Sequence, residues 1–279
     1  MINIKMYCMC LNNHHIDSVK KMNYLPVGLG NNQFSKEWIR DNTGENISIK
    51  NKHYGEYTFY YWFWKNLLPK IEDNTWIGFS GYRYHWSNQN KLKSDDLNIK
   101  VTKDNFFSML LQNTPEEWED YEVVLGEELY INKWKLSKIL KKGYKVLLRN
   151  PFAFIKSKQN IKLNFDVFHG YGNLDKAIQL LDEKEREDFK KFTTSKSSFN
   201  RENLFICRSK KLIDGYFSSI FPWLERCEKL FGFELEGYGK TRMYAFLAER
   251  YLSYWFNKYS KPLSWPIFFF DTNINKLNL

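Results

Sequence analysis

The fold is decided by the stretch TWIGFSGYRY, residues 75–84. A short apolar run that ends in glycine and polar residues is typical of a buried strand running into a turn. Toward the N-terminus, residues 2–9 predict another strand, and residues 55–68 predict an aromatic, buried helix that ends at Pro69. Ligands of α/β sheets sit at the carboxyl ends of strands, so residues 82–85 are expected near a ligand.

Toward the C-terminus, the same alternation continues. Strands are expected at 121–125 and 203–207, and helices at 175–191 and about 240–259, with a further amphipathic helix around 216–230. Thr114 is expected to cap a helix that begins at Pro115. Strands that alternate with helices favour a layered α/β fold with a mainly parallel sheet.

The length of 279 residues fits one α/β domain, and we expect a single domain over 1–279. No apolar run approaches the roughly 18 residues of a membrane helix, and the N-terminus lacks the long apolar core of a secretory signal. The four cysteines have no zinc or redox spacing, which indicates reduced thiols and a cytoplasmic protein.

The net charge of +10 indicates an anionic partner, but lysines and arginines occur in short runs with acids between them. A nucleic-acid-binding protein would gather them on one face. No nucleic-acid partner is therefore expected, although this reading and that of a non-catalytic carbohydrate-binding protein remain the alternatives. The aromatic fraction of 18% suits a large core and also stacking on bases or sugar rings.

Four groups of residues are candidates for chemistry. Loop 41–52 is dense in hydrogen-bonding side chains, so it is either a solvated loop or a polar wall for a sugar or nucleotide. Arg83 is either a phosphate clamp or half of an ion pair. His169 and Asp175 form either a general-base arrangement or packing and capping groups. Arg242 and Glu249 share one face of the last helix, as a buried ion pair or as a site.

Several signatures are missing. The chain has no glycine-rich phosphate loop, no Gly-x-Ser-x-Gly elbow and no paired-histidine metal helix. The Asp-x-Asp metal motif of many sugar transferases is also missing, so no metal ligand is predicted and metal dependence is left open.

A set of motifs in a fixed order resembles a known bacterial family. The motifs are YLPVGLG at 24–30, DNTGENIS at 41–48, KN at 50–51, YxE at 54–56, YWxWKN at 61–66 and IGxxxYR at 77–83, followed by NLFI at 203–206, KKLIDGY at 210–216 and RxxxFLAER at 242–250. The family was long filed as a domain of unknown function, and its members are usually described as capsular or exopolysaccharide glycosyltransferases. The likeness covers nearly the whole chain.

The resemblance implies a GT-A-like (Rossmann-like) fold and a nucleotide-sugar-dependent hexosyltransferase. Residues 1 to about 125 would hold the donor, a UDP-sugar by preference, and residues 126–279 would complete the acceptor side. The chain departs from the family where members commonly read His-Tyr-Arg-Arg, since it has Gly81-Tyr82-Arg83-Tyr84. Any role of that histidine and second arginine fails here, and His85 either substitutes for them or has no role.

Residue roles follow from the matched motifs. Arg83 and Arg242 would bear the charge of the leaving diphosphate in place of a metal. Glu249, Asp175 and His169 are candidates for the catalytic base, unranked. The remaining donor-binding candidates are Asn46, Ser48, Asn51, Glu56, Tyr82 and Asn203. The acceptor would be a glycan, either free or lipid-linked, and the basic surface would contact the inner membrane leaflet peripherally.

Overall fold

The computed structural model describes residues 3–89, 101–131, 146, 148 and 159–272. The main sheet has seven strands in the order β10-β6-β9-β4-β1-β2-β3. Their bounds are β1 Lys5–Cys10, β2 Leu25–Gly28, β3 Ile39–Arg40, β4 Ile77–Gly81, β6 Val123–Gly126, β9 Phe205–Cys207 and β10 Leu263–Trp265. Strand β9 pairs antiparallel with β4 and β6, whereas every other pairing in this sheet is parallel. The predicted α/β class with a mainly parallel sheet is confirmed.

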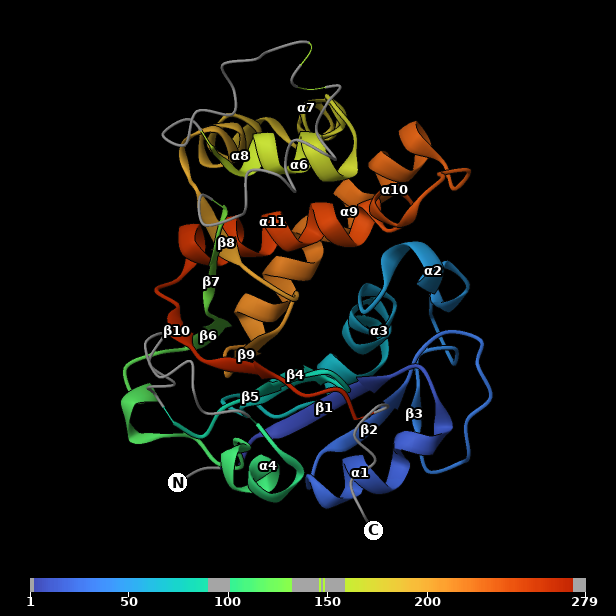
Figure 1. Cartoon of the computed structure of the whole chain (residues 1–279), viewed down its shortest axis with the longest axis vertical. Helices are drawn as coiled ribbons and strands as arrows, with labels where there is room; N and C mark the ends of the chain where they lie inside the picture. Colours follow the sequence, from blue (N-terminus) through green and yellow to red (C-terminus); the bar gives the residue numbers. More distant parts are fainter. Residues whose placement is uncertain (1–2, 90–100, 132–145, 147, 149–158, 273–279) are drawn as a thin grey trace.

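Helices cover both faces of this sheet (Figure 1). Below it in that view lie α1 (Ile16–Lys21) and α4 (Lys103–Met109); above it lie α2 (Asn51–Tyr54), α3 (Tyr57–Trp62), α9 (Lys210–Phe231), α10 (Tyr238–Thr241) and α11 (Met243–Tyr259). A further group above α11 comprises α6 (Ile161–His169), α7 (Asn173–Gln179) and α8 (Glu183–Ser195). Two small sheets pair β5 (Tyr84–Trp86) with β11 (Ile267–Phe269), and β7 (Glu128–Tyr130) with β8 (Ser198–Asn200).

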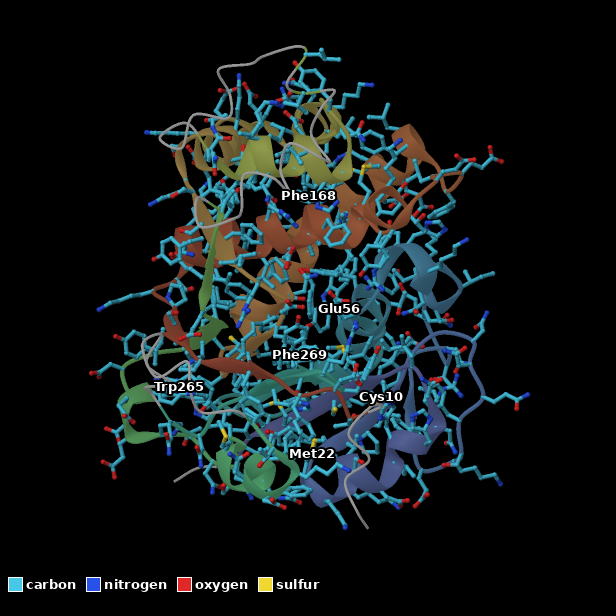
Figure 2. All side chains as sticks on the ribbon, in the orientation of Figure 1. Cys10, Met22, Glu56, Phe168, Trp265 and Phe269 are labelled. Atoms are coloured by element: carbon cyan, nitrogen blue, oxygen red, sulfur yellow. The ribbon has the colours of Figure 1, made fainter. Side chains whose placement is uncertain are left out.

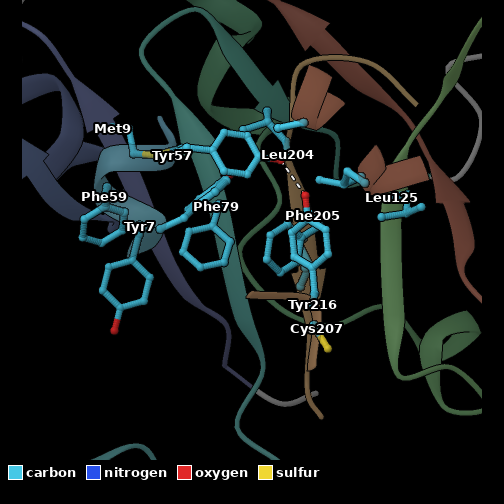
Figure 3. Packing of buried hydrophobic residues seen from close by; sticks show 14 of the residues in the cluster. Tyr7, Met9, Tyr57, Phe59, Phe79, Leu125, Leu204, Phe205, Cys207 and Tyr216 are labelled. Atoms are coloured by element: carbon cyan, nitrogen blue, oxygen red, sulfur yellow. Dashed lines mark hydrogen bonds between the residues drawn. The ribbon is translucent and has the colours of Figure 1, made fainter. Parts of the chain in front are cut away.

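The core between the sheet and the upper helices is aromatic, which answers the high aromatic content of the sequence. Phe79 of β4 lies at its centre, with ring centroids 4.7 Å from Tyr60 of α3 and 4.8 Å from Phe205 of β9. Tyr7 of β1 stacks on the same ring, as the close view of the core shows (Figure 3). These edge-to-face and stacked contacts fix α3 against β1, β4 and β9, and thereby fix the residues that precede α3.

Two helix predictions were wrong in their bounds. The segment expected as one helix over 55–68 consists of α3, a π-helix at Phe63–Leu67 and a 3-10 turn at Leu68–Lys70. Gly55 has φ +58°, so the helix starts after it, and Pro69 is tolerated inside the first turn of the 3-10 segment. Residues 175–191 are divided between α7 and α8, because Asp182 adopts an extended conformation and begins a new helix.

Three smaller corrections concern other segments. The predicted cap Thr114 lies one residue too early, since Pro115 occupies the N-cap of a 3-10 turn at Glu116–Trp118. The segment 41–52 is not a loop throughout: it contains a 3-10 turn at Ser48–Lys50 and the start of α2. The last helix is interrupted at Arg242, which separates α10 from α11.

Candidate active site

Two adjoining cavities share a wall, and the first of them lies at the carboxyl ends of the parallel strands. The first, cavity A, has a volume of about 160 Å³ and is lined by residues that follow β1, β2 and β4, among them Leu11, Leu29 and Gly81 to Arg83. Strand β1 has β2 on one side and β4 on the other. The order in which successive strands are added to the sheet therefore changes direction at β1. Crevices at such switch points are where open α/β sheets bind their ligands.

The second cavity, cavity B, has a volume of about 550 Å³ and lies against α6, α10 and α11. Its walls are rich in aromatic rings, from Phe168, Phe199 and Phe246, with charged side chains at Arg201 and Lys240. In Figure 2, Phe168 is labelled in the upper helical group and Glu56, which lines cavity A, is labelled below it.

Cavities A and B share a wall of four residues: Glu202, Tyr238, Phe246 and Glu249. Two of these four are acids. The backbone N–H of Glu202 donates to the Glu249 carboxylate at 2.8 Å, which holds the two residues side by side. A group bound in one cavity therefore meets a group bound in the other at this pair of carboxylates.

Glu202 has the properties of a general base. Its pKa is raised to about 7, chiefly by burial and also by the nearby negative charge of Glu249, while Arg201 and a hydrogen bond from Tyr84 act in the opposite direction. A carboxylate with a pKa near neutrality can both take and return a proton at physiological pH. Its backbone φ of +72°, followed by +56° at Asn203, is rare for residues other than glycine and occurs preferentially at functional sites.

Glu249 is more constrained. Burial raises the pKa of its carboxyl, but the Arg250 guanidinium, which contacts its second oxygen, lowers it. One carboxylate oxygen of Glu249 accepts a hydrogen bond from the Glu202 N–H, and the other accepts from Arg250. Glu249 therefore holds these two residues in position. The structure thus brings this predicted base to the shared wall and places Glu202, which the sequence reading missed, beside it.

His169 lies on the far side of the same network. Its Nδ1 is 2.9 Å from the carbonyl oxygen of Gly239, and its Nε2 is 3.5 Å from the Arg250 guanidinium. The ring is stacked on Phe246 at 4.0 Å. These contacts make His169 a lining residue of cavity B that holds α10 and Arg250 in place.

The cationic side of cavity A comes from two arginines. The exposed guanidinium of Arg83 forms no hydrogen bond or ion pair with the part of the chain that the structure describes. Arg242 Nη2 lies 3.3 Å from the Glu56 carboxylate. A Cβ on Gly55 would lie 2.1 Å from the same Nη2, so glycine at this position leaves room for the guanidinium.

Asn203 holds Glu56 in place. Its amide donates to the Glu56 carboxylate and to the Ala245 carbonyl oxygen, and its own oxygen accepts from the Tyr57 hydroxyl at 3.2 Å. The side chain is 4% exposed. Although Asn203 lines cavity A, the hydrogen bonds proposed for sugar hydroxyls are already used inside the protein, so it is a positioning residue here.

The other predicted site residues fall into two groups, those that line cavity A and those that line neither cavity. Asn51, Glu56 and Tyr82 line cavity A, as do Arg83, Arg242, Asn203 and Glu249. Asn46 and Ser48 line neither cavity; their side chains hydrogen-bond each other at 2.8 Å. Asp175 also lies outside both, in an ion pair with Lys162 at 2.8 Å. His85, the suggested substitute, is buried beside Phe106 and Phe268, and burial lowers its pKa to about 4.

Loop 41–52 supports the site chiefly through contacts with neighbouring elements and does not form much of its lining. Its buried Asp41 accepts hydrogen bonds from the Gly30 N–H at 2.8 Å and from the Thr58 hydroxyl at 2.6 Å. Lys50 pairs with Glu228 of α9 at 2.8 Å. The density of polar side chains in this loop therefore ties β2, α3 and α9 together, and Asn51 alone within 41–52 reaches cavity A.

Two further properties bear on the site. All four cysteines are free and buried. Within the described ranges, no three His, Cys, Asp or Glu residues lie close enough together to hold a metal ion. Nor does any described helix have the length and apolar character needed to cross a membrane.

Comparison with known proteins gives a family and a fold. A family model described as "Domain of unknown function (DUF4422)" matches residues 5–261. No curated protein matches the sequence. Among solved structures, the fold is similar to that of WbbM, a bifunctional glycosyltransferase in its apo form, with a TM-score of 0.64 and 18% sequence identity. The match covers 96% of this chain and 45% of that one, so the chain spans less than half of its length.

Proposed function

The chain belongs to the DUF4422 family, which confirms the resemblance seen in its motifs, and on that premise we propose that it is a glycosyltransferase. The proposed reaction moves a sugar from a nucleotide-sugar donor to a hydroxyl of a glycan acceptor. The observation that carries this proposal is the shared wall: an acid with a raised pKa stands between a cavity with free positive charge and a larger cavity walled by aromatic rings.

Cavity A is the proposed donor site. It lies at the switch point of the sheet, and its two guanidiniums match the chemistry of a diphosphate, which arginine binds through two parallel hydrogen bonds. Arg83 is available for this contact, whereas Arg242 must exchange Glu56 for phosphate oxygens. The small volume of cavity A agrees with this exchange, because the Arg242–Glu56 pair fills space that the donor would take.

Glu202 is the proposed base. In the step we envisage, the acceptor oxygen forms a bond with the anomeric carbon, the bond from that carbon to the diphosphate breaks, and Glu202 takes the acceptor proton. The electron pair of the broken bond leaves with the diphosphate, whose charge Arg83 and Arg242 stabilise. Glu249 holds the backbone of Glu202 and raises its pKa.

The acceptor and its location are further parts of this proposal. By the family resemblance, the acceptor is a growing capsular or other cell-surface polysaccharide, in its lipid-linked form at the inner leaflet of the cell membrane. The net charge of +10 favours contact with an anionic surface. Flotation with vesicles of anionic and of neutral lipid tests this part alone, since absence of binding would remove the membrane contact and leave the transferase proposal intact.

A thermal-shift screen tests the proposed function. UDP-, GDP-, CMP- and dTDP-sugars are each added with manganese or with EDTA, because a ligand that binds the folded state raises the apparent melting temperature. We expect a rise with one nucleotide class, UDP first, and its response to EDTA reports whether a metal assists. The absence of any shift, repeated with a glycan present, would count against a nucleotide-sugar site.

A further inference from the structure

One aromatic side chain of cavity B, that of Tyr238, is largely exposed although its backbone is held firmly in place. Tyr238, at the start of α10, is 70% exposed and lines both cavities. Its ring meets Phe246 edge-on at 6.0 Å, and the Arg242 guanidinium lies 6.0 Å from its centroid. Most of the ring therefore faces open space at the junction of the two cavities.

The backbone that carries Tyr238 is held from several sides. Gly239 packs so closely on α6 that a Cβ there would lie 2.2 Å from the carbonyl oxygen of Phe168. The carbonyl oxygen of Gly239 lies within hydrogen-bond distance of Nδ1 of His169, and the carbonyl oxygen of Thr241 lies 2.9 Å from Nδ1 of His53. Short helix α10 is thus anchored at both ends, and the exposed ring projects from a rigid base.

The surroundings of the ring match the chemistry of a sugar. A pyranose has an apolar face of C–H groups and a rim of hydroxyls, so it needs an aromatic surface with polar groups around it. In cavity B the aromatic surfaces are Tyr238 and Phe246, and the exposed side chains of Lys240 and Glu236 lie at the rim. The cavity volume of about 550 Å³ falls within the range of small-molecule sites.

An unpaired donor lies deeper in the same cavity. The amide nitrogen of Asn164, a residue 3% exposed, has no hydrogen-bond partner among the described residues, and the same is true of Nε of Arg250. Buried donors are normally paired, and both residues line cavity B, so a small side-chain movement that exposed either nitrogen would let it bind an oxygen in the cavity. A hydroxyl oxygen of a bound sugar, directly or through water, has the required chemistry.

We infer that cavity B is a subsite for a pyranose ring of the acceptor glycan, which stacks on Tyr238 and presents a hydroxyl toward Glu202. This inference rests on the proposed function and adds the class of group that cavity B binds and the residue that orients it. Tyr238 is a positioning residue in this scheme, since Glu202 takes the proton.

The test uses the full chain and two readouts. Saturation-transfer NMR measures binding of methyl glycosides of glucose, galactose and N-acetylglucosamine, which requires no turnover. The variants are Tyr238→Ala, Tyr238→Phe and Tyr238→Trp, with Tyr171→Ala as the control, because Tyr171 is 47% exposed and lines neither cavity. We expect the ring protons of a bound glycoside to be saturated in the wild type, Tyr238→Phe, Tyr238→Trp and Tyr171→Ala, and the signal to fall at least fivefold in Tyr238→Ala.

In turnover, Tyr238→Ala is expected to raise the KM for a glycan acceptor at least tenfold and to raise the KM for the donor by a smaller factor. A glycoside signal that is absent from the wild type or unchanged in Tyr238→Ala would overturn the inference. An equal loss of nucleotide binding in Tyr238→Ala would overturn it too and assign the ring to the donor. Tyr238-dependent sugar binding without any nucleotide binding would instead keep the subsite and remove the transferase proposal.

Discussion

The carboxylate of Glu249 accepts the backbone N–H of Glu202 at 2.8 Å, and this one hydrogen bond places two acids on the wall between the cavities. It also ties α11 to the segment before β9, where two consecutive residues have positive φ. The conformation of Glu202 therefore depends on Glu249, and the raised pKa of Glu202 depends on the charge and burial that this contact imposes.

Replacement of Glu202 tests its role as the base. Glu202→Gln keeps the shape of the side chain but cannot accept a proton, so kcat should fall by about 10²- to 10⁴-fold. In the wild type, kcat/KM should rise with pH until about 7, where the carboxylate becomes ionised, and then level off. The exposed Glu187→Gln serves as the control. A Glu202→Gln enzyme with wild-type rates would exclude this residue and return attention to Glu249.

The same carboxyl should also affect stability. Its folded pKa of about 7 exceeds the ordinary value of 4.5, so its contribution to stability is fully present below about pH 4.5 and is lost as the pH rises through 7. Each pKa unit corresponds to about 1.4 kcal/mol, so the loss is at most about 3 kcal/mol. Glu202→Gln, which cannot ionise, should raise the melting temperature at pH 8.5 but leave it nearly unchanged at pH 4. An equal shift at both pH values would contradict the raised pKa.

The two arginines of cavity A should separate binding from stability. Arg83 is exposed and forms no ion pair within the described ranges, so Arg83→Ala should weaken nucleoside diphosphate binding about 10- to 100-fold at an almost unchanged melting temperature. Arg242→Ala should weaken binding and also lower stability, because the Glu56 carboxylate loses its cationic partner and keeps only the hydrogen bond from Asn203. Calorimetric titration and thermal melts measure the two effects. The double variant Arg242→Ala/Glu56→Gln should recover stability without recovering affinity; recovery of both would show that Arg242 does not contact the ligand.

Gly55 offers a matched test of how Arg242 is placed. Gly172 has φ +75° and ψ −2°, in the left-handed helical region, where alanine costs about 1–2 kcal/mol of strain. Gly55 has φ +58° and ψ −132°, where alanine is more strained, so the comparison concerns affinity in folded protein rather than stability. A Cβ at 55 would lie 2.1 Å from Arg242 Nη2, whereas a Cβ at 172 would meet nothing within 4 Å. Gly55→Ala should therefore weaken nucleoside diphosphate binding about tenfold and Gly172→Ala should not. Equal affinities in the two variants would mean that the observed position of Arg242 is unimportant for binding.

Four of the seven strands, β1, β4, β6 and β9, could be predicted because they are short apolar runs, such as Ile77–Gly81 and Val123–Gly126. Strands β2, β3 and β10 were not predicted. Helix bounds were harder, because they depend on single backbone conformations. Gly55 and Asp182 both interrupt apolar periodicity that otherwise continues, and neither residue type by itself forces a break. An amphipathic pattern predicts which face of a helix is buried more reliably than it predicts the residues at which the helix begins and ends.

The site was partly predictable for the same reason. Arg83 follows a strand that the sequence shows plainly. The seven-residue spacing of Arg242 and Glu249 predicted a common side, and both line cavity A although Arg242 lies just before α11. Glu202 was missed because its importance arises from burial and from Glu249, which lies 47 positions later in the chain. Its one local signal is its position directly before Asn203 at the start of a strand. Asn46 and Ser48 were predicted to bind the donor because a polar loop that forms hydrogen bonds within itself has the same composition as one that binds a ligand.

The most direct test of the central claim is the release of free nucleotide from UDP-, GDP-, CMP- and dTDP-sugars, measured with a glycan acceptor present. The wild type, Glu202→Gln and Arg83→Ala are compared at pH 8, where the Glu202 carboxylate is ionised. We predict that the wild type cleaves one donor class and that each variant is slower by at least tenfold, Glu202→Gln through kcat and Arg83→Ala mainly through the donor KM. Cleavage that both variants perform at the wild-type rate, or no cleavage of any donor by the wild type, would contradict the assignment of this wall as a transferase active site.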